Sequence, residues 1–268
     1  MATDPAPPVL SATSHDAAPG SNPFAAMLLA DARLPTGGHA YSAGAEPALR
    51  AGLAPDRLRE YMIGRAQTTS LVEAGTAVVA RHVLLNEPGP SVVEPVPSVV
   101  ESVPSMVERS RNHHRQHLDD VLDAWAARTP SPALREASVA QARGFLRLAR
   151  SLWRDSPVHE ILAALRRPPC RAVALGAVAV MAPMSAAELV RLVIYDDAAT
   201  AAAALLKLEP RDPAEVSGWV LEACAAGEPS VDTLAALTDP GAIPASGAPQ
   251  TEEWAQAHAV MNQRLFRA

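Results

Sequence analysis

The sequence predicts an all-α protein with a single helical-bundle domain. Its 268 residues are 49% hydrophobic but only 4% aromatic. The core must therefore be built mainly from Ala, Leu and Val, which favours closely packed helices over sheets. No segment shows a sustained alternation of apolar and polar residues, the pattern of a half-buried strand. A single domain of this length buries about 70% or more of its unfolded-chain surface, so it needs no disulfide or metal for stability.

Charge and cysteine content exclude several classes of protein. The formal net charge is −6, and the basic residues are spread along the chain, so we expect no nucleic-acid binding. Cys170 and Cys224 lie far apart and match no paired metal-ligand spacing, which is typical of a reducing cytosol. The longest apolar run, 172–183, is shorter than the roughly 20 residues of a membrane span. Residues 1–23 lack the features of a secretory signal. We expect a soluble, cytoplasmic protein without membrane association.

The N-terminal part is predicted to contain a leader followed by two short helices. Residues 1–22 are rich in Pro, Ala, Ser and Asp and are predicted to be disordered. The all-helical domain would then occupy residues 23–268. Helical segments are expected at 24–31 and 39–51, and a proline and two glycines interrupt them at 34–38.

A longer helical stretch is predicted over residues 56–85. Its apolar residues recur at helical spacing, and Asp56 is placed to cap its start. Glycines at 64 and 75 leave open a division into two helices near either position.

A repeated segment interrupts the helical pattern after Asn86. Three imperfect copies of one heptad begin at Ser91, Ser98 and Ser105. Heptads favour a coiled coil, but Pro97 and Pro104 would remove backbone donors and clash with the preceding turns. We therefore predict a low-complexity, extended insert over residues 87–112, with the next amphipathic helix beginning near residue 118.

The C-terminal half contains clear helix starts. Ser131 with Pro132 opens a helix whose polar face is basic. After a shorter helix at 157–165, the Ala- and Val-rich stretch that follows Arg171 is predicted to be buried on every side.

Three further helices complete the prediction. Ser185 and Glu188 form a capping box for a helix that ends near Lys207, and Asp212 caps the next one. After a loop rich in Pro and Gly, the final helix is expected over residues 251–266.

No catalytic motif is present in the sequence. The phosphate-binding GxxxxGK[ST] loop, the HExxH metal motif and the GxSxG elbow are all absent. An enzyme would therefore need a site assembled from distant helices.

Two groups of residues are weak candidates for metal binding. His113, His114 and His117 could place two imidazoles on one helical face, and imidazole binds first-row transition metals. We favour a solvated linker end, because neighbouring arginines repel a cation. Cys170 is a second candidate, although a lone cysteine is more often a small buried hydrophobe.

Asp196 falls on the apolar side of its helix. It is either a polar anchor or metal ligand, or a carboxylate at the helix surface. We favour the surface position, because the adjacent Asp197 gives that face another way to remain solvated.

Several segments together resemble one family. Residues 28–46 read LLADARLPTGGHAYSAGAE, which is similar to the N-terminal signature LLxLxDxxLPxGGFxxSxGLE of the urease accessory protein UreF family. Agreement continues in order at residues 142–148, 173–178 and 196–210, and the chain closes on Arg-Leu-Phe at 264–266. The resemblance runs from about residue 24 to the C-terminus, excluding the heptad insert.

The resemblance implies a helical scaffold without a catalytic site. A member of this family dimerises and joins the chaperone UreD (or UreH) and the GTPase UreG on apo-urease, where it helps nickel insertion. It implies no tightly bound cofactor, with nickel as a metal in transit. The alternatives are an α-helical enzyme and a ligand-sensing regulator of unknown substrate.

The resemblance also implies which residues contact partners. They come from the N-terminal signature, one basic residue and the C-terminal tail: Leu34, Pro35, Gly37, Gly38, His39, Tyr41, Ser42, Glu46, Lys207, Arg264, Leu265 and Phe266. The family usually has an aromatic residue at position 39, and usually histidines where this chain has Cys170-Arg171. Residues 250–268 would form a partner-binding helix with one apolar face, and packing of this helix on the chain's own core is the open alternative. The apolar face comprises Trp254, Ala257, Val260, Met261 and Leu265.

Overall fold

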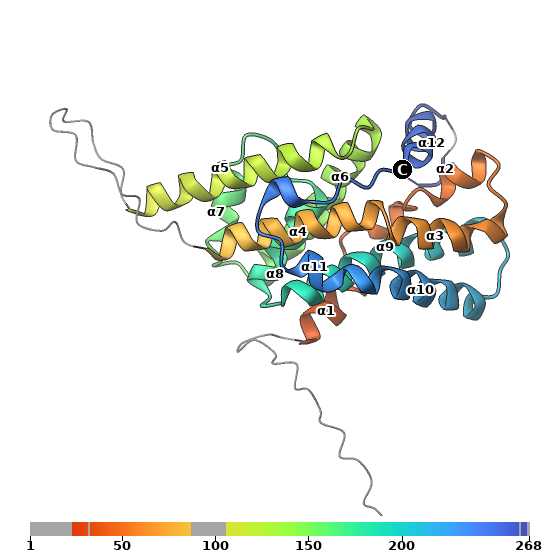
Figure 1. Ribbon diagram of the computed structural model, residues 1–268, viewed down its shortest axis with the longest axis horizontal. Helices are drawn as coiled ribbons and strands as arrows, with labels where there is room; N and C mark the ends of the chain where they lie inside the picture. Colours follow the sequence, from red (N-terminus) through yellow and green to blue (C-terminus); the bar gives the residue numbers. More distant parts are fainter. Residues whose placement is uncertain (1–22, 32, 87–105, 263, 267–268) are drawn as a thin grey trace, which may run out of the picture.

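The computed structural model describes residues 23–31, 33–86, 106–262 and 264–266, and within these ranges it contains helices and no β-strand (Figure 1). This confirms the predicted all-α fold. The predicted leader and residues 87–105 of the insert lie outside the described part.

The α-helices are α1 (Pro23–Leu29), α2 (Ala45–Arg50), α3 (Leu58–Ala66), α4 (Thr69–Leu85), α5 (Met106–Ala127), α6 (Pro132–Leu152), α7 (Val158–Ala163), α8 (Arg171–Met181), α9 (Ala186–Leu208), α10 (Pro213–Gly227), α11 (Val231–Ala235) and α12 (Pro249–Ala259). Short 3-10 turns are η1 (Gly38–Ala40), η2 (Pro55–Arg57), η3 (Glu228–Ser230) and η4 (Pro240–Ala242).

Helix α8 lies at the centre of the bundle. It packs against α4 and α6, and nearly all of its residues are buried, as predicted for the stretch after Arg171. A Cβ atom at Gly176 of α8 would overlap the carbonyl oxygen of Ala77 in α4. Only a small residue lets the two backbones approach this closely, which explains how a core poor in aromatic residues is closely packed.

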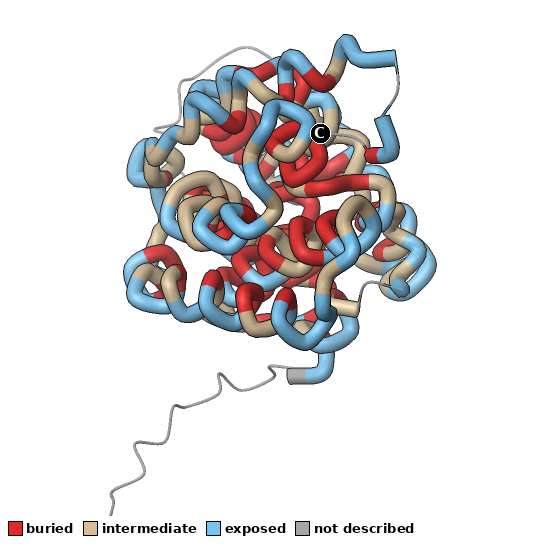
Figure 2. Tube along the Cα trace, turned by 90° about the vertical axis from the view of Figure 1, so that its right-hand side faces the viewer, coloured by how far each residue is buried: buried red, intermediate tan, exposed pale blue. Residues whose placement is uncertain are grey.

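The remaining helices surround this centre. Helix α9 packs against α4 and α10, while α3 contacts both α9 and α10. Helix α5 covers α4, and α12 contacts both α6 and α2 (Figure 1). The view in Figure 2 shows buried segments gathered inside the bundle and exposed ones around it. The contact between α12 and α2 brings the C-terminal part of the chain to its N-terminal part.

The predicted helix starts at Ser131, Ser185 and Asp212 are confirmed. The Leu134 amide donates to Ser131 Oγ at 3.3 Å, and the Ala214 amide donates to Asp212 Oδ1 at 2.9 Å. Ser185 forms both hydrogen bonds of its capping box. Each cap satisfies a backbone donor that the first helical turn leaves unpaired.

The predicted stretch 56–85 is divided near Gly64, one of the two positions predicted, and not near Gly75. Helix α3 ends at Ala66 and α4 begins at Thr69. The Thr68 hydroxyl donates to the carbonyl of Gly64 at 2.7 Å, a side-chain bond that competes with helical continuation. Asp56 lies in η2 and pairs with Arg211, so it does not cap a helix.

The insert ends earlier than the predicted boundary at 112. Helix α5 begins at Met106, so residues 106–112 are helical. The third heptad copy ends in Arg111 where the earlier copies end in proline, so nothing interrupts the helix there. Arg111 forms an ion pair of 2.6 Å with Glu160, which ties this first part of α5 to α7.

Two other predicted helices are shorter in the structure. The segment predicted at 39–51 divides into η1 and α2, with a turn at Ala43 and Gly44 between them. The final helix, predicted to reach Phe266, ends at Ala259. Beyond it, the described residues are not helical, and two of their amides are bound by a carboxylate of α2.

Candidate functional site

The signature loop, residues 34–46, is held in two tight turns. Gly37 and Gly44 have φ values of 81° and 78°, in the left-handed region that glycine adopts without a steric penalty. Ala43 also has a positive φ, of 47°, and its carbonyl accepts a hydrogen bond of 2.9 Å from the Tyr61 hydroxyl. A Cβ atom at Gly44 would overlap that hydroxyl. The glycine is therefore required both for the turn and for the contact with α3.

Glu46, the last residue of the signature, binds the C-terminal tail. Its side chain is 0% exposed, and its carboxylate accepts hydrogen bonds from the backbone amides of Leu265 (2.9 Å) and Phe266 (2.8 Å). Arg50 donates to the same carboxylate at 2.9 Å, and His258 Nε2 lies 3.2 Å from it. Burial alone would raise the pKa of Glu46, but these donors hold it below its ordinary value.

Lys207 lies where the signature loop and the tail meet. Its ammonium group is 3.5 Å from the carbonyl oxygen of His39 and 5.2 Å from the centre of the Phe266 ring. The structure thus brings together the three groups of residues that the sequence singled out. We call His39, Lys207 and Leu265, which are all exposed, the junction surface.

The other predicted partner residues divide into exposed and buried ones. Pro35, Gly38 and Arg264 are exposed, and Leu34 and Gly37 are half-buried. Those that are buried and support the loop and tail from inside are Tyr41, Ser42, Glu46 and Phe266.

The C-terminal tail is buried on one side and exposed on the other. Helix α12 buries Thr251, Ala255 and His258 against the protein, as the alternative of packing on the chain's own core requires. The predicted apolar face is mostly turned outward: Trp254 is half-buried, and Ala257, Val260, Met261 and Leu265 are exposed.

A cavity of about 380 Å³ lies beneath the signature loop, between α4, α6 and α9. Its walls include Tyr41, Lys207 and Phe266 from the site described above. Apolar side chains such as Val72 and Phe145 line the rest, together with charged groups from α3, α4, α8 and α9.

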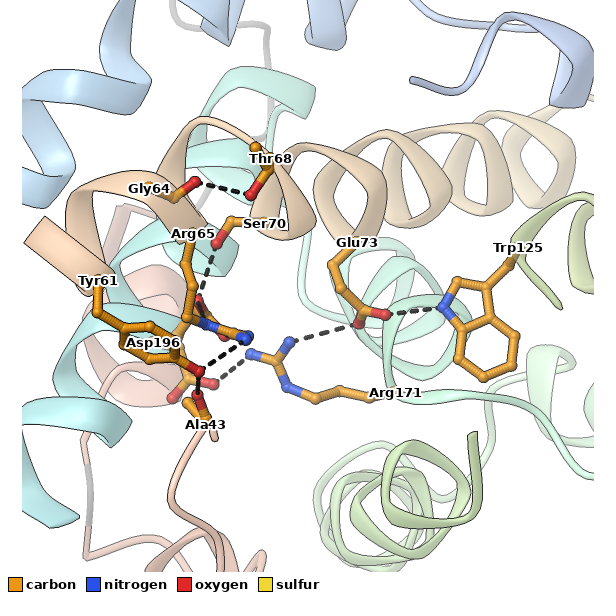
Figure 3. A network of polar contacts seen from close by, with 11 residues as sticks. Ala43, Tyr61, Gly64, Arg65, Thr68, Ser70, Glu73, Trp125, Arg171 and Asp196 are labelled. Atoms are coloured by element: carbon orange, nitrogen blue, oxygen red, sulfur yellow. Dashed lines mark hydrogen bonds and ion pairs between the residues drawn. The ribbon is translucent and has the colours of Figure 1, made fainter. Parts of the chain in front are cut away.

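Those charged groups form two linked clusters (Figure 3). In the first, Arg65 donates two hydrogen bonds to Asp197, of 2.9 and 2.6 Å, and the Ser70 hydroxyl donates to the same carboxylate at 2.9 Å. Arg65 also lies 3.5 Å from the Tyr61 hydroxyl that holds the signature loop. Burial opposes the charge on Asp197, but Arg65 keeps the pKa of this carboxyl below its ordinary value.

The second cluster is centred on Arg171, at the start of α8. Its guanidinium pairs with Asp196 and lies 3.5 Å from Glu73, and Glu73 accepts a hydrogen bond of 2.7 Å from Trp125 Nε1. Asp196 is therefore a polar anchor, and the favoured prediction of a helix-surface carboxylate was wrong. The prediction missed that an arginine at the start of α8 faces this position.

The sequence carried a signal for these clusters. Glu73 interrupts the apolar run of α4, and Arg171 begins the most buried helix. Charged residues in such positions need partners, because an unpaired buried charge is costly.

The three histidines occupy a helix and not a linker. His113 and His117 lie side by side on α5, with ring centres 4.2 Å apart and ring planes tilted by 57°. His114 is buried and bonded to the carbonyl of Asn86 at 2.9 Å, so one imidazole already has a protein partner. Cys170 is fully buried, and burial raises the pKa of its thiol. Among the described residues, no group of three or more His, Cys, Asp or Glu side chains is arranged to hold a metal ion.

Comparison with known proteins gives a consistent result. The UreF family model matches residues 55–224. The urease accessory protein UreF of Mycobacterium marinum is 34% identical over 221 residues, covering 80% of this chain and 88% of its own length. The UreF proteins of Mycobacterium sp. (strain JLS) and Mycobacterium bovis are 34% and 32% identical, with the same coverage.

Fold, site and relatives together define a helical accessory protein and not an enzyme. Helices of the described part are too short or too polar to cross a membrane. The chain belongs to the UreF family of urease accessory proteins. It has a role in urease maturation, in partnership with other urease accessory proteins.

Proposed function

We propose that this chain is a scaffold that bridges the chaperone UreD (or UreH) and the GTPase UreG on apo-urease, and that it regulates the GTP-dependent delivery of nickel. The observation that supports this proposal is the junction surface. Lys207 lies against the His39 carbonyl and the Phe266 ring, and the exposed Leu265 is the neighbour of Phe266 in the chain, so three distant parts of the chain meet here. A partner that binds there contacts both ends of the domain at once.

The junction surface has a rigid support, which favours its use in recognition. Glu46 fixes the tail amides from inside, and Tyr61 fixes the turn that leads into α2. Side chains held in this way lose little conformational freedom when a partner binds. Lys207 adds a positive charge at the end of α9, which suits an acidic group on the GTPase.

Nickel is cargo in this proposal, with no resident cofactor on the chain. The complex is cytoplasmic and contains two copies of this chain. The proposal assigns the histidines of α5 no role in holding the metal, because His114 already bonds to Asn86.

The test is reconstitution with purified UreD, UreG and apo-urease. The wild-type chain should be retained by UreD and should then capture UreG. Lys207→Ala should weaken capture of UreG about tenfold while leaving retention by UreD and the thermal melt unchanged. Arg57→Ala, which removes an exposed charge from η2, is the matched control.

The outcomes separate the alternatives. If the wild-type chain binds none of these proteins, the scaffold proposal fails. If Lys207→Ala behaves like Arg57→Ala, Lys207 only stabilises the end of its helix, and the GTPase binds elsewhere.

A further inference from the structure

Helix α6 carries a row of arginines on one face. Arg143, Arg147 and Arg150 are spaced by four and three residues, so they lie on one side of the helix, and Arg154 follows in the turn just past its end. At 1.5 Å per residue the row's three helical members span roughly 10 Å. All four side chains are exposed. We call these four residues the arginine row.

The arginine row has no carboxylate partners. In the described part of the chain, none of its members forms an ion pair, and the one hydrogen bond that their side chains make joins Arg154 Nε to the Ser151 carbonyl at 3.5 Å. Arginines elsewhere on the surface, such as Arg57 and Arg191, are paired with glutamates. The overall charge of −6 thus conceals a local concentration of unneutralised positive charge.

The arginine row does not help α6 to fold. Like charges three or four positions apart on a helix repel each other. The helix is held instead by its opposite face, where Ala142, Phe145 and Ala149 are buried in the core. The row is therefore free to serve an external partner without loss of the fold.

The row also borders the functional site. Gly144 lies between two of its members, and a Cβ atom there would overlap the carbonyl of Thr36 in the signature loop. Phe145 lines the cavity beneath the same loop. A molecule that lies along the arginine row would reach the signature loop.

We propose that the arginine row docks an acidic segment of a partner protein in the urease maturation complex, an inference that rests on the proposed function. A partner segment whose carboxylates are spaced three and four residues apart on a helix would match the row in length and in spacing. Glu136 precedes the row on the same face of α6, and Asp155 follows its last arginine. These two carboxylates would repel an acidic segment that is shifted beyond either end of the row, so they fix its register.

A protein partner fits this surface better than a membrane or DNA. Both of those are extended polyanions, and a chain of charge −6 is repelled by them at long range. The row acts only within about 8 Å at physiological salt, so it favours a small acidic group brought close by other contacts.

The experiment compares two sets of substitutions with equal charge. Arg143→Gln, Arg147→Gln and Arg150→Gln are combined in one variant of the full chain. The control combines Arg57→Gln, Arg59→Gln and Arg191→Gln, which removes three arginines that are already paired. Both variants are titrated against purified UreD, UreG and apo-urease, singly and together, at 0.05 and 0.3 M salt.

The row variant should bind one of these proteins at least about tenfold more weakly at low salt, because three interface charges each contribute a fraction of a kcal/mol. Its affinity should also depend less on salt than that of the wild type, while the control keeps the wild-type affinity. A row variant with wild-type affinity and salt dependence would overturn the inference and leave the scaffold proposal intact. Wild-type protein that binds none of the three would overturn both.

Two further measurements test the nature of the partner. Wild-type chain and row variant are mixed with vesicles containing 30% phosphatidylserine and with a 20-base-pair DNA duplex. Neither should bind the wild type at physiological salt. If the wild type binds the vesicles or the DNA and the row variant does not, the partner of the arginine row is a membrane or a nucleic acid and not an acidic protein.

Discussion

The backbone amide of Phe266 donates a hydrogen bond of 2.8 Å to the buried carboxylate of Glu46, across 220 positions of the sequence. The bond joins the end of the N-terminal signature to the end of the described tail. Since Lys207 lies against both the His39 carbonyl and the Phe266 ring, release of the tail would also dismantle the junction surface. Tail and signature therefore form one structural unit.

Glu46→Gln should release the tail without unfolding the domain. The amide side chain presents one acceptor in place of two and loses the charge that Arg50 and the tail amides bind. We expect a loss of about 1–3 kcal/mol in the free energy of unfolding, the usual range for charged hydrogen bonds. Hydrogen exchange at the Leu265 and Phe266 amides should become much faster.

The matched control is Glu253→Gln, which neutralises an exposed carboxylate of α12. It should leave both the stability and the exchange of the tail amides unchanged. If Glu46→Gln leaves the exchange of those amides slow, the tail is held by the Phe266 ring and not by the carboxylate.

The same contact predicts a dependence of stability on pH. Burial lowers the pKa of His258 below its ordinary value of 6.5, although the neighbouring Glu46 carboxylate acts in the opposite direction. The folded state therefore binds fewer protons than the unfolded chain as the pH falls below 6.5, so stability is lost in that window. The pKa of Glu46 is also lowered, and its contribution is lost at more acidic pH, below about 4.5.

Thermal melts between pH 8 and pH 5 test this dependence. The wild-type melting temperature should fall between pH 7 and pH 5, and in His258→Gln this fall should be smaller. If the melting temperature falls equally in the wild type and in His258→Gln, other histidines cause the pH dependence. His82→Gln, which changes a half-buried histidine in the last turn of α4, is the control.

The elements that sequence reasoning placed correctly are those whose signals are local. The caps at Ser131, Ser185 and Asp212 depend only on residues within one turn. The burial of α8 follows from its composition alone. By contrast, the end of α12 at Ala259 depends on tail contacts with the distant Glu46.

The candidate site shows the same division. The signature, Lys207 and the tail could be named from the sequence through family resemblance, but their meeting at one surface could not, because it depends on how α2, α9 and α12 pack. The roles of Arg65 and Arg171 were missed for a similar reason. Their partners Asp197 and Asp196 lie 132 and 25 positions away, and only the fold brings them together.

Breaking the ion pair between Arg65 and Asp197 should destabilise the domain. Both side chains are nearly buried, with exposures of 13% and 12%. Arg65→Met leaves the Asp197 carboxylate in the interior with the Ser70 hydroxyl as its remaining partner, and we expect a loss of about 3–5 kcal/mol. Arg65→Met combined with Asp197→Leu should lose less, because no unpaired charge remains.

Urea denaturation of the two single variants and the double variant measures this coupling. Arg57→Met, which breaks an exposed pair with Glu60, should change stability by less than about 1 kcal/mol. A double variant as unstable as the sum of both single ones would mean that the pair is not coupled.

Gly144→Ala should disturb the signature loop from below. A Cβ atom at this position would overlap the carbonyl oxygen of Thr36, a backbone atom that cannot rotate away. Either α6 or the loop must shift, and overpacking of this kind destabilises by about 1–3 kcal/mol. The same substitution at Gly218 of α10, where nothing lies within 4 Å of the added atom, should stabilise by about 0.5–1 kcal/mol, since alanine is the better helix former. The two variants thus make the same chemical change but should change the stability in opposite directions.

Thermal melts measure the direction of each change, and capture of UreG in the presence of UreD reports whether the loop has moved. If Gly144→Ala melts and binds like Gly218→Ala, the loop adapts freely to α6, and its conformation is not fixed by this contact.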